Sequence, residues 1–496
     1  MQPVTFIQVY RGIYKKYFNI KRQTSIRTME YDKVIADPIH GMMTFEPYLM
    51  KIINHPHFQR LRHIKQLQGV EHVYPGGVHS RFSHCLGVCY LAGIVLDKLE
   101  KKTKNTDYEI TDLDRKCVTI SALCHNIGHG PFSYLYERLS REIDSDPFEH
   151  VARSVEITQS IIDDDSLKLF EDKTERTDAK TIIENMLKGK KVEEMTAKEQ
   201  KKAFLYQIVK NNDNGVDVNR WDFISRDSHA CGFMSNFDSN RAVSGLRVVS
   251  YKKEGIDANV LAFPFKDEIH LYNMFHLRFT LYSKVYYHTV VKCVEEMITD
   301  VFKLVDEIKI LNTKENSIST KECRSHGAIE NFCLMDDKLL YLIYHADDTS
   351  FKKPEKLKHA HAIAIMDRIH NRDFYFCIYK KQLDSSEKVG RLLEEINKRS
   401  ETDNSIRGRF RFNIAEVNYG NGNKNPIKNV YFYSKGGDSV IEYKQPVNSP
   451  MVPQCFEEIT LRVICTIRKK DWDSSGSEDE LKTQIDSFFE NVFNQQ

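Results

Sequence analysis

Two segments that contain histidine motifs carry apolar residues at helical spacing. The apolar positions are Leu91, Ile94, Val95 and Leu99 in HCLGVCYLAGIVLDKLEKK, and Leu113, Cys117, Ile120 and Cys124 in DLDRKCVTISALCHNIGH. A spacing of three or four residues places such side chains on one face of an α-helix. Residues 33 to about 300 are therefore predicted to be mainly helical.

The pattern changes after about residue 370. FYFCIY (374–379) is a short apolar and aromatic run of strand length. NVYFYSKGGDSVIEYKQ (429–445) contains two β-rich runs joined across Gly436 and Gly437, which is typical of a β-hairpin. The sequence therefore predicts a mostly α fold with a smaller C-terminal α/β lobe.

Four polar segments are predicted to lie at the margins of this fold. Residues 187–202 and 312–327 are rich in charged and polar side chains, which indicates exposed charged helices or loops. Residues 1–32 indicate a basic N-terminal arm. In residues 471–496 an acidic linker leads into SEDELKTQIDSFFENVF, where a capping box and an apolar stripe predict a docked terminal helix.

Composition excludes several classes of protein. The chain has 496 residues, of which 41% are hydrophobic, and this is enough for a large core. The net charge of +2 gives no overall basic field for nucleic acid, and no run approaches the roughly 20 apolar residues of a membrane span. The start lacks the order of a signal peptide, and the eleven cysteines contain no CxxC pair. We therefore expect an intracellular chain with free thiols and no membrane partner.

Histidines and acids gather in five short motifs. These are SRFSHCLGV (His84), CHNIGHG (His125 and His129), FEH (His150), DVNRWDF (217–223) and RDSH (Asp227 and His229). A lone histidine is usually a core or surface residue, but several clusters with glycine-supported turns indicate a metal site. Imidazole and carboxylate together suit Zn, Fe, Mn or Mg.

These motifs resemble the HD-domain dNTP triphosphohydrolase family. The shared words are KVIADPIHG (33–41), FQRLRHIKQLQGV (58–70), HSRFSHCLGV (79–88), ALCHNIGHGPFS (122–133), NGVDVNRWDF (214–223), NFDSNR (236–241), LYNMFHLRFTLYSKVYYH (271–288) and NYGNGNKNPI (418–427). All eight follow the order of the family, from about residue 33 to about residue 470. The resemblance implies a helical HD domain (33–300), a C-terminal lobe (301–470) and cleavage of a dNTP to deoxynucleoside and triphosphate.

The resemblance is greatest to vertebrate members in which a sterile alpha motif domain precedes the HD domain. Only about thirty residues precede the first shared word, so we expect that domain to be absent here.

The resemblance places the metal ligands at His84, His125, Asn126 and Asn219. Both histidines of the family pattern are present, but both aspartates are replaced by asparagine. Two carboxylates balance the charge of a divalent cation, whereas two amides contribute none, and hard divalent ions prefer anionic oxygen. Asp217 lies two residues before Asn219, about 200° away round a helix, so it is not expected to replace it. The cofactor is thus a divalent metal (Zn, Fe, Mn or Mg) or none.

The catalytic positions of the family fall on Tyr134, Glu137 and His150. Tyr134 stands where the family has a histidine, and a phenol with a pKa near 10 is a poor proton donor at neutral pH. Glu137 keeps the charge of the family acid on a longer side chain. His150 is the family residue.

Much of the nucleotide cradle is retained. The positions that the resemblance assigns to substrate binding are Gln66, Leu67, Arg81, His129, Arg220, Asp227, Arg278 and Tyr286. Those that it assigns to activating nucleotides between subunits are Lys33, Val34, Asn54, Gln59, Arg62, Asp238, Arg241 and Lys266. Asn54 replaces an acid that reads the guanine edge, and an amide offers only one acceptor where a carboxylate accepts two N–H bonds.

Three functions are compatible with these residues. The first is a catalytically impaired relative or pseudoenzyme that binds nucleotide or pairs with an active relative. The second is a working triphosphohydrolase with a His/His/Asn/Asn metal site. The third is a nucleic-acid-binding protein or scaffold, which the basic N-terminal run supports. The resemblance favours deoxynucleotide or GTP ligands, a dimer or tetramer, and the nucleus; single-stranded nucleic acid is the partner of the third function.

Overall fold

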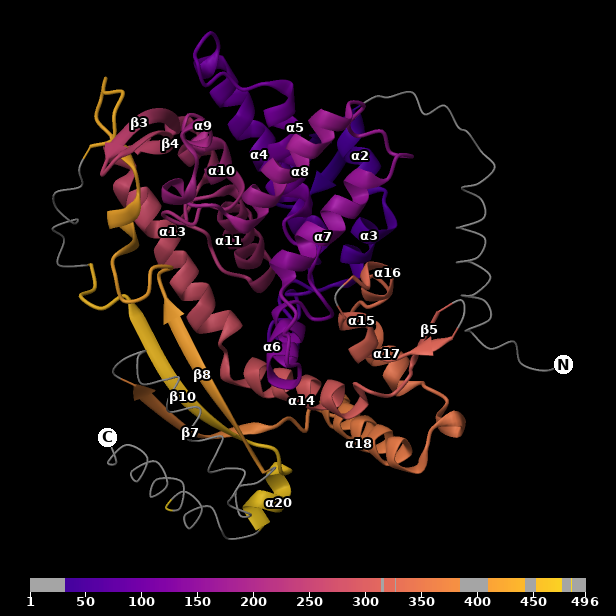
Figure 1. Cartoon of the computed structure of the whole chain (residues 1–496). Coiled ribbons are helices and arrows are strands. Elements are labelled where there is room, and N and C mark those ends of the chain that lie inside the picture. The colour runs from indigo at the N-terminus through magenta and orange to yellow at the C-terminus, as the bar shows by residue number, and fades with distance from the viewer. Residues whose placement is uncertain are drawn as a thin grey trace.

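The computed structural model describes residues 32–313, 316–325, 327–383, 409–441, 452–474 and 483. The predicted basic arm, almost all of the predicted terminal helix and the end of the predicted hairpin lie outside these residues. The mostly α fold with small sheets is confirmed (Figure 1).

The helices alternate with short strands along the chain. The α-helices are α2 (Pro47–Ile53), α3 (Pro56–Gln59), α4 (Arg81–Thr103), α5 (Asp112–Cys124), α6 (Tyr134–Ile143), α7 (His150–Asp163), α8 (Lys173–Lys188), α9 (Ala197–Gln200), α10 (Ala203–Val209), α11 (Val218–Cys231), α12 (Ser239–Gly245), α13 (Glu268–Leu281), α14 (Thr289–Val305), α15 (Thr320–Arg324), α16 (Ile329–Phe332), α17 (Leu339–Tyr344), α18 (Lys353–His370) and α20 (Lys469–Ser474). The 3₁₀-helices are η1 (Arg60–His63), η2 (Val70–His72), η3 (Val192–Glu194), η4 (Phe265–Asp267), η6 (Asp348–Ser350) and η7 (Pro426–Asn429), and η5 (Tyr282–Tyr286) is a π-helix. The strands are β1 (Lys33–Asp37), β2 (Gly41–Phe45), β3 (Arg247–Lys253), β4 (Ile256–Pro264), β5 (Leu311–Asn312), β6 (Ser317–Ile318), β7 (Phe376–Leu383), β8 (Phe410–Asn418), β9 (Phe432–Tyr433) and β10 (Glu457–Cys465).

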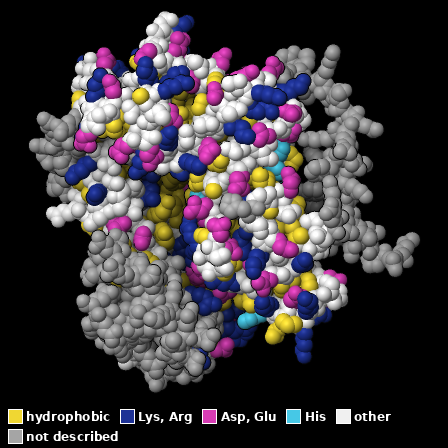
Figure 2. All heavy atoms as spheres, in the orientation of Figure 1, with side chains coloured by type: hydrophobic (Ala, Val, Ile, Leu, Met, Phe, Trp, Pro, Cys, Tyr) yellow, Lys and Arg dark blue, Asp and Glu magenta, His cyan; other side chains and the backbone are white. Residues whose placement is uncertain are grey.

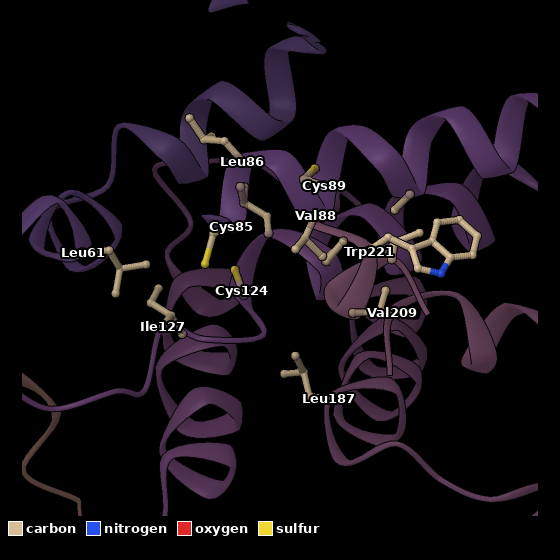
Figure 3. Packing of buried hydrophobic residues seen from close by; sticks show 14 of the residues in the cluster. Leu61, Cys85, Leu86, Val88, Cys89, Cys124, Ile127, Leu187, Val209 and Trp221 are labelled. Carbon is tan, nitrogen blue, oxygen red and sulfur yellow. The ribbon is translucent and has the colours of Figure 1, made fainter. Parts of the chain in front are cut away.

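Helix α4 is the centre of the core and packs against α5 and α11. Figure 3 shows Cys85 and Cys124 close together between α4 and α5, with Trp221 of α11 further along the same core. The length of α4 and its mean hydropathy of 1.3 would also suit a membrane span, but 67% of that window is buried inside the protein. All eleven cysteines are unpaired, as expected for a chain without a disulfide framework.

Two sheets place C-terminal strands against the rest of the protein. β8 and β7 flank β10 in an antiparallel sheet, and β4 lies between β3 and β9. In the described part of the predicted hairpin at 429–445, Phe432 forms an antiparallel bridge with Ile441, and it also pairs in parallel with Phe263 of β4. The predicted boundary at residues 300/301 falls inside α14, which packs on α18 of the C-terminal part.

The expectation that residues 187–202 and 312–327 are simply exposed is wrong. Leu187, Val192 and Met195 are buried, and α9 packs on β4. In the second segment β5 and β6 pair, and Arg324 is buried in an ion pair with Asp306. Both segments contain spaced apolar residues that pack against the core. This spacing was not recognised in the sequence because charged residues surround it.

A buried charge cluster connects β1, α4 and α11. Asp222 of α11 accepts hydrogen bonds from His40 Nε2 and His84 Nδ1, each at 2.7 Å, and from Arg226 Nε at 2.9 Å. Arg226 also donates to Asp37 at 2.8 Å. Burial alone would raise the pKa of Asp222, but Arg226 and the hydrogen bonds hold it well below its ordinary value. The cluster is buried and its charged groups are paired, which is the condition under which buried charges are tolerated.

Gly87→Ala should strongly destabilise the protein. A Cβ at Gly87 would lie 1.9 Å from Asp222 Oδ1 and 2.5 Å from Arg226 Nη2, so it would separate a buried ion pair at a cost of about 3–5 kcal/mol. Gly93 lies in the same helix with nothing within 4 Å of its Cβ position, so Gly93→Ala should stabilise by about 0.5–1 kcal/mol. The measurement is urea unfolding of both variants. Equal stabilities would contradict this role of Gly87.

Candidate functional site

The two predicted histidine ligands face each other at the junction of α4 and α5. His84 Nε2 and His125 Nε2 are 3.1 Å apart, and the amide oxygen Oδ1 of Asn219 lies 3.1 Å from His84 Nε2. His84 Nδ1 donates to Asp222, so the Nε2 of neutral His84 carries a lone pair. Since Zn–N bonds are about 2.0–2.1 Å long, two imidazole nitrogens on one tetrahedral ion would lie about 3.4 Å apart. With Asn126, whose Nδ2 contacts His125 Nε2, the structure brings all four predicted ligands together.

Asn126 lies between Arg81 and His125. Its Nδ2 donates to His125 Nε2, and its Oδ1 accepts from Arg81 Nη1 at 3.3 Å. Both neighbours fix this orientation: arginine has only donors, and His125 Nε2 is an acceptor because His125 Nδ1 donates to Ala122 O at 2.7 Å. Burial lowers the pKa of His125 well below its ordinary value, which keeps the ring neutral. A carboxylate at position 126 could accept from Arg81 but could not donate to His125.

These four positions do not fit a hard divalent ion. They provide no anionic oxygen, which Mg²⁺ and Mn²⁺ require, and the amide oxygen of Asn126 faces the cation Arg81. Asp217 does not take over the role of Asn219. Its carboxylate caps α11, where it accepts from the backbone N–H groups of Arg220 at 2.8 Å and Asn211 at 3.0 Å.

A second group of side chains, His129, Glu137 and His150, is a candidate metal centre. Its ligand atoms all lie within 4.8 Å of one another. His150 Nδ1 donates to Glu137 at 2.5 Å, and the rings of His129 and His150 stack with centroids 4.1 Å apart. Burial alone would raise the pKa of Glu137, but His150 and Arg141 lower it, so the acid is ionised. Both ring nitrogens of His129 are buried without a hydrogen-bond partner in the described part of the chain.

Tyr134 stands beside this group at the start of α6. Its ring centroid is 4.9 Å from that of His129 and 5.3 Å from the Arg81 guanidinium carbon. The side chain is 50% exposed, yet burial raises its pKa above the ordinary value. Tyr134 therefore lies at the solvent-facing side of the site, which is called the cleft below. At pH 7 the side chain is a neutral phenol. Position 134 therefore supplies no imidazole acid, as the sequence predicted.

The opposite side of the site is a polar cluster around Asp227. Asp227 accepts from Tyr286 Oη, from His79 Nε2 at 2.7 Å and from Gln66 Nε2 at 3.4 Å. The buried Gln66 Oε1 has no partner among the described residues, and adjacent Leu67 is buried. His79 was missed in the sequence, although it lies in the word HSRFSH.

Three predicted arginines lie around the same site. Arg81 belongs to α4, Arg220 to α11 and Arg278 to α13. Arg81 Nε donates to Ser133 Oγ at 2.9 Å, and Arg278 Nη1 donates to the backbone oxygen of Asn418. Arg220 lies over the Phe275 ring at 5.6 Å. Burial, and then the charge of Arg278, lower the pKa of Arg220 to about 10. In the described part of the chain none of the three arginines forms an ion pair.

The positions assigned to activating nucleotides are exposed, except for the half-buried Gln59. Gln59 Nε2 donates to Ile53 O at 2.6 Å and accepts from Arg62 at 2.7 Å, which groups these residues beside Asn54 at the end of α2. Arg241 pairs with Asp267 at 2.8 Å, next to Lys266, and Asp238 caps α12. Lys33 and Val34 are exposed on β1. Among the described residues no hydrogen bond joins the group around Asn54 to the group around Arg241.

Asp337, which precedes α17, holds the turn that carries HGPFS. It accepts backbone N–H bonds from Phe132 at 2.6 Å and Lys65 at 2.8 Å. Phe132 and Ser133 have φ values of 54° and 57°, a strained conformation for residues other than glycine. Ser133 Oγ in turn accepts from Arg81, so a carboxylate far away in the sequence fixes the cradle arginine.

The geometry defines an HD-domain protein, and comparison with known proteins agrees. Residues 81–211 match the HD domain family model. The chain is 31% identical to mouse deoxynucleoside triphosphate triphosphohydrolase SAMHD1 over 92% of this chain and 72% of the relative. It is 32% identical to the human protein over 87% and 70%, and 31% identical to the Dictyostelium discoideum SAMHD1 homolog over 90% and 80%. The chain belongs to the SAMHD1-like dNTP triphosphohydrolase family.

The pKa of Asp337 should make stability depend on pH. Burial raises this pKa to about 7, above the unfolded value of about 3.9. The folded state therefore holds this proton more tightly. Its contribution is fully present below about pH 4 and is lost as pH rises to about 7. Asp337→Asn should flatten the decline in unfolding free energy across this window, as measured by urea unfolding at a series of pH values.

Asp165→Asn, a change at an exposed acid, is the matched control for this titration. It should leave the pH slope of the unfolding free energy unchanged. A slope in Asp337→Asn equal to that of the unaltered protein would contradict the assignment.

Proposed function

We propose that this chain is a nucleotide-binding member of the dNTP triphosphohydrolase family that has lost most or all catalysis. The observation that carries the proposal is the hydrogen bonding of Asn126. Its amide accepts a hydrogen bond from Arg81 and donates one to His125. The amide thus stands where a carboxylate would hold a metal. The neutral phenol of Tyr134 supports the same conclusion, because it supplies no imidazole for proton transfer.

Retention of the cradle supports nucleotide binding. Arg81 and Arg220 present guanidinium groups, which match phosphate oxygens in pairs, and Asp227 is fixed by three donors. In the described part of the chain the buried Nη1 of Arg220 has no hydrogen-bond partner, and a buried unpaired donor is costly unless a ligand satisfies it.

The first expected outcome concerns metal. The purified chain should contain far less than one equivalent of metal, and Mn²⁺ or Zn²⁺ should leave its unfolding temperature unchanged. In Asn126→Asp/Asn219→Asp the metal-free protein has two carboxylates facing imidazole lone pairs, so added metal should raise the unfolding temperature by several degrees. Elemental analysis and thermal scans measure both effects. Asn429→Asp, which adds a charge at an exposed position, should show no metal response.

The second expected outcome concerns turnover. The unaltered chain should release no triphosphate from any of the four dNTPs, with or without GTP. Adding Tyr134→His to the Asn126→Asp/Asn219→Asp variant should restore release, because the triple variant regains both the anionic ligands and the imidazole. Triphosphate release by the unaltered chain, at a rate comparable to that of the triple variant, would sink the proposal.

A working triphosphohydrolase is the second candidate, and the His129, Glu137 and His150 group favours it. A metal at this centre would have one anionic and two imidazole ligands. Stoichiometric metal that is lost in His129→Ala but kept in His125→Ala would support that arrangement and displace the first proposal.

A further inference from the structure

We propose that the cleft binds the polyphosphate of a nucleotide as the metal-free anion, and that Mg²⁺ weakens this binding. The inference rests on the proposed function and adds the charge state of the ligand. It starts from the arginines Arg81, Arg220 and Arg278, none of which forms a salt bridge with another described residue. The acid beside Arg220, Asp217, is engaged with the backbone N–H groups of Arg220 and Asn211.

Arg220 is the clearest case. Its guanidinium occupies a slot in which Cβ atoms at Gly215 and Gly420 would lie 2.7 Å and 2.9 Å from Nη1. Within the described part of the chain Nη1 is buried and has no hydrogen-bond partner. A cation kept under these conditions is stabilised by a ligand that brings several negative charges.

The carboxylates of the cleft are already engaged. Asp227 accepts from His79, Tyr286 and Gln66, and Glu137 accepts from His150 and Arg141. The positions that would face a metal on the ligand hold amides, at Asn126 and Asn219. Mg²⁺ on a polyphosphate is normally held by one or two protein carboxylates, and it cancels two of the ligand's negative charges. The ion would therefore remove attraction to the arginines without gaining a protein ligand.

The matched positions provide the control for this reasoning. In Asn126→Asp/Asn219→Asp the same cleft has two added carboxylates, so the free anion should be repelled and the Mg²⁺ complex accepted. The preference for metal should reverse between the two proteins, although the arginines are identical.

Calorimetric titration of inorganic tripolyphosphate tests the inference. With EDTA the full-length chain should bind it, and excess MgCl₂ should weaken binding by about tenfold or more. Arg220→Gln should weaken binding with EDTA by about 30-fold or more. Lys201→Gln, which removes the same charge at an exposed ion pair, should bind as the unaltered chain does. The free Arg220→Gln protein should unfold at the same or a higher temperature, because a buried donor without a partner among the described residues is removed.

Two results would overturn the inference. One is tripolyphosphate binding that requires Mg²⁺; the other is binding with EDTA that Arg220→Gln leaves unchanged. Neither result bears on the proposed loss of catalysis, which fails only if the unaltered chain releases triphosphate from a dNTP. An inactive chain that binds only the magnesium complex thus separates failure of the inference from failure of the proposed function.

Discussion

The site depends on one buried carboxylate. Asp222 receives hydrogen bonds from the loop after β1, from α4 and from its own helix α11, so it sets the relative positions of all three. It also fixes the proton of His84 on Nδ1 and aims Nε2 at His125. This orientation needs no metal. A chain that lacks anionic metal ligands can therefore keep the paired imidazoles in the geometry of a metal site.

The exchange of carboxylate for amide changes which network is complete. With aspartate at position 126 the imidazole lone pairs would face a negative group, and a cation would be needed to join them. With Asn126 the donors and acceptors alternate from Arg81 through the amide to His125. Positive and negative side chains are interspersed on the face that Figure 2 shows, so the local charge of the cleft, and not a broad field, carries the argument for an anionic ligand.

Local patterns predicted the helices well. The spacing in α4 and α5 buried Leu91, Leu99 and Cys117 as expected, and the histidine words met at the junction of these helices. Metal and substrate residues could be proposed because they lie in short motifs that a family shares. The structure gives the positions of these residues, and their roles stay predictions.

Partners that are distant in sequence could not be predicted. Asp337 accepts a hydrogen bond from the backbone N–H of Phe132, about two hundred residues earlier in the sequence. Its neighbours in the sequence, DDK, do not distinguish it from a surface acid. His40 and Asp222 likewise become partners only after β1 and α11 pack together. The pairing of β9 with β4 could not be predicted for the same reason: local β propensity at 429–433 does not indicate a partner strand about 170 residues earlier.

The parallel pairing of β9 with β4 has a consequence for synthesis. Phe263 of β4 can pair with Phe432 of β9 only after residue 432 has been synthesised. Most of the chain must therefore leave the ribosome before this sheet has its third strand. Until then β4 presents an open edge, and open edges are where chains associate wrongly. Such distant pairings also slow folding. β9 thus covers the edge of β4. A truncated chain that ends before β9 would leave this edge open and would be a substrate for chaperones.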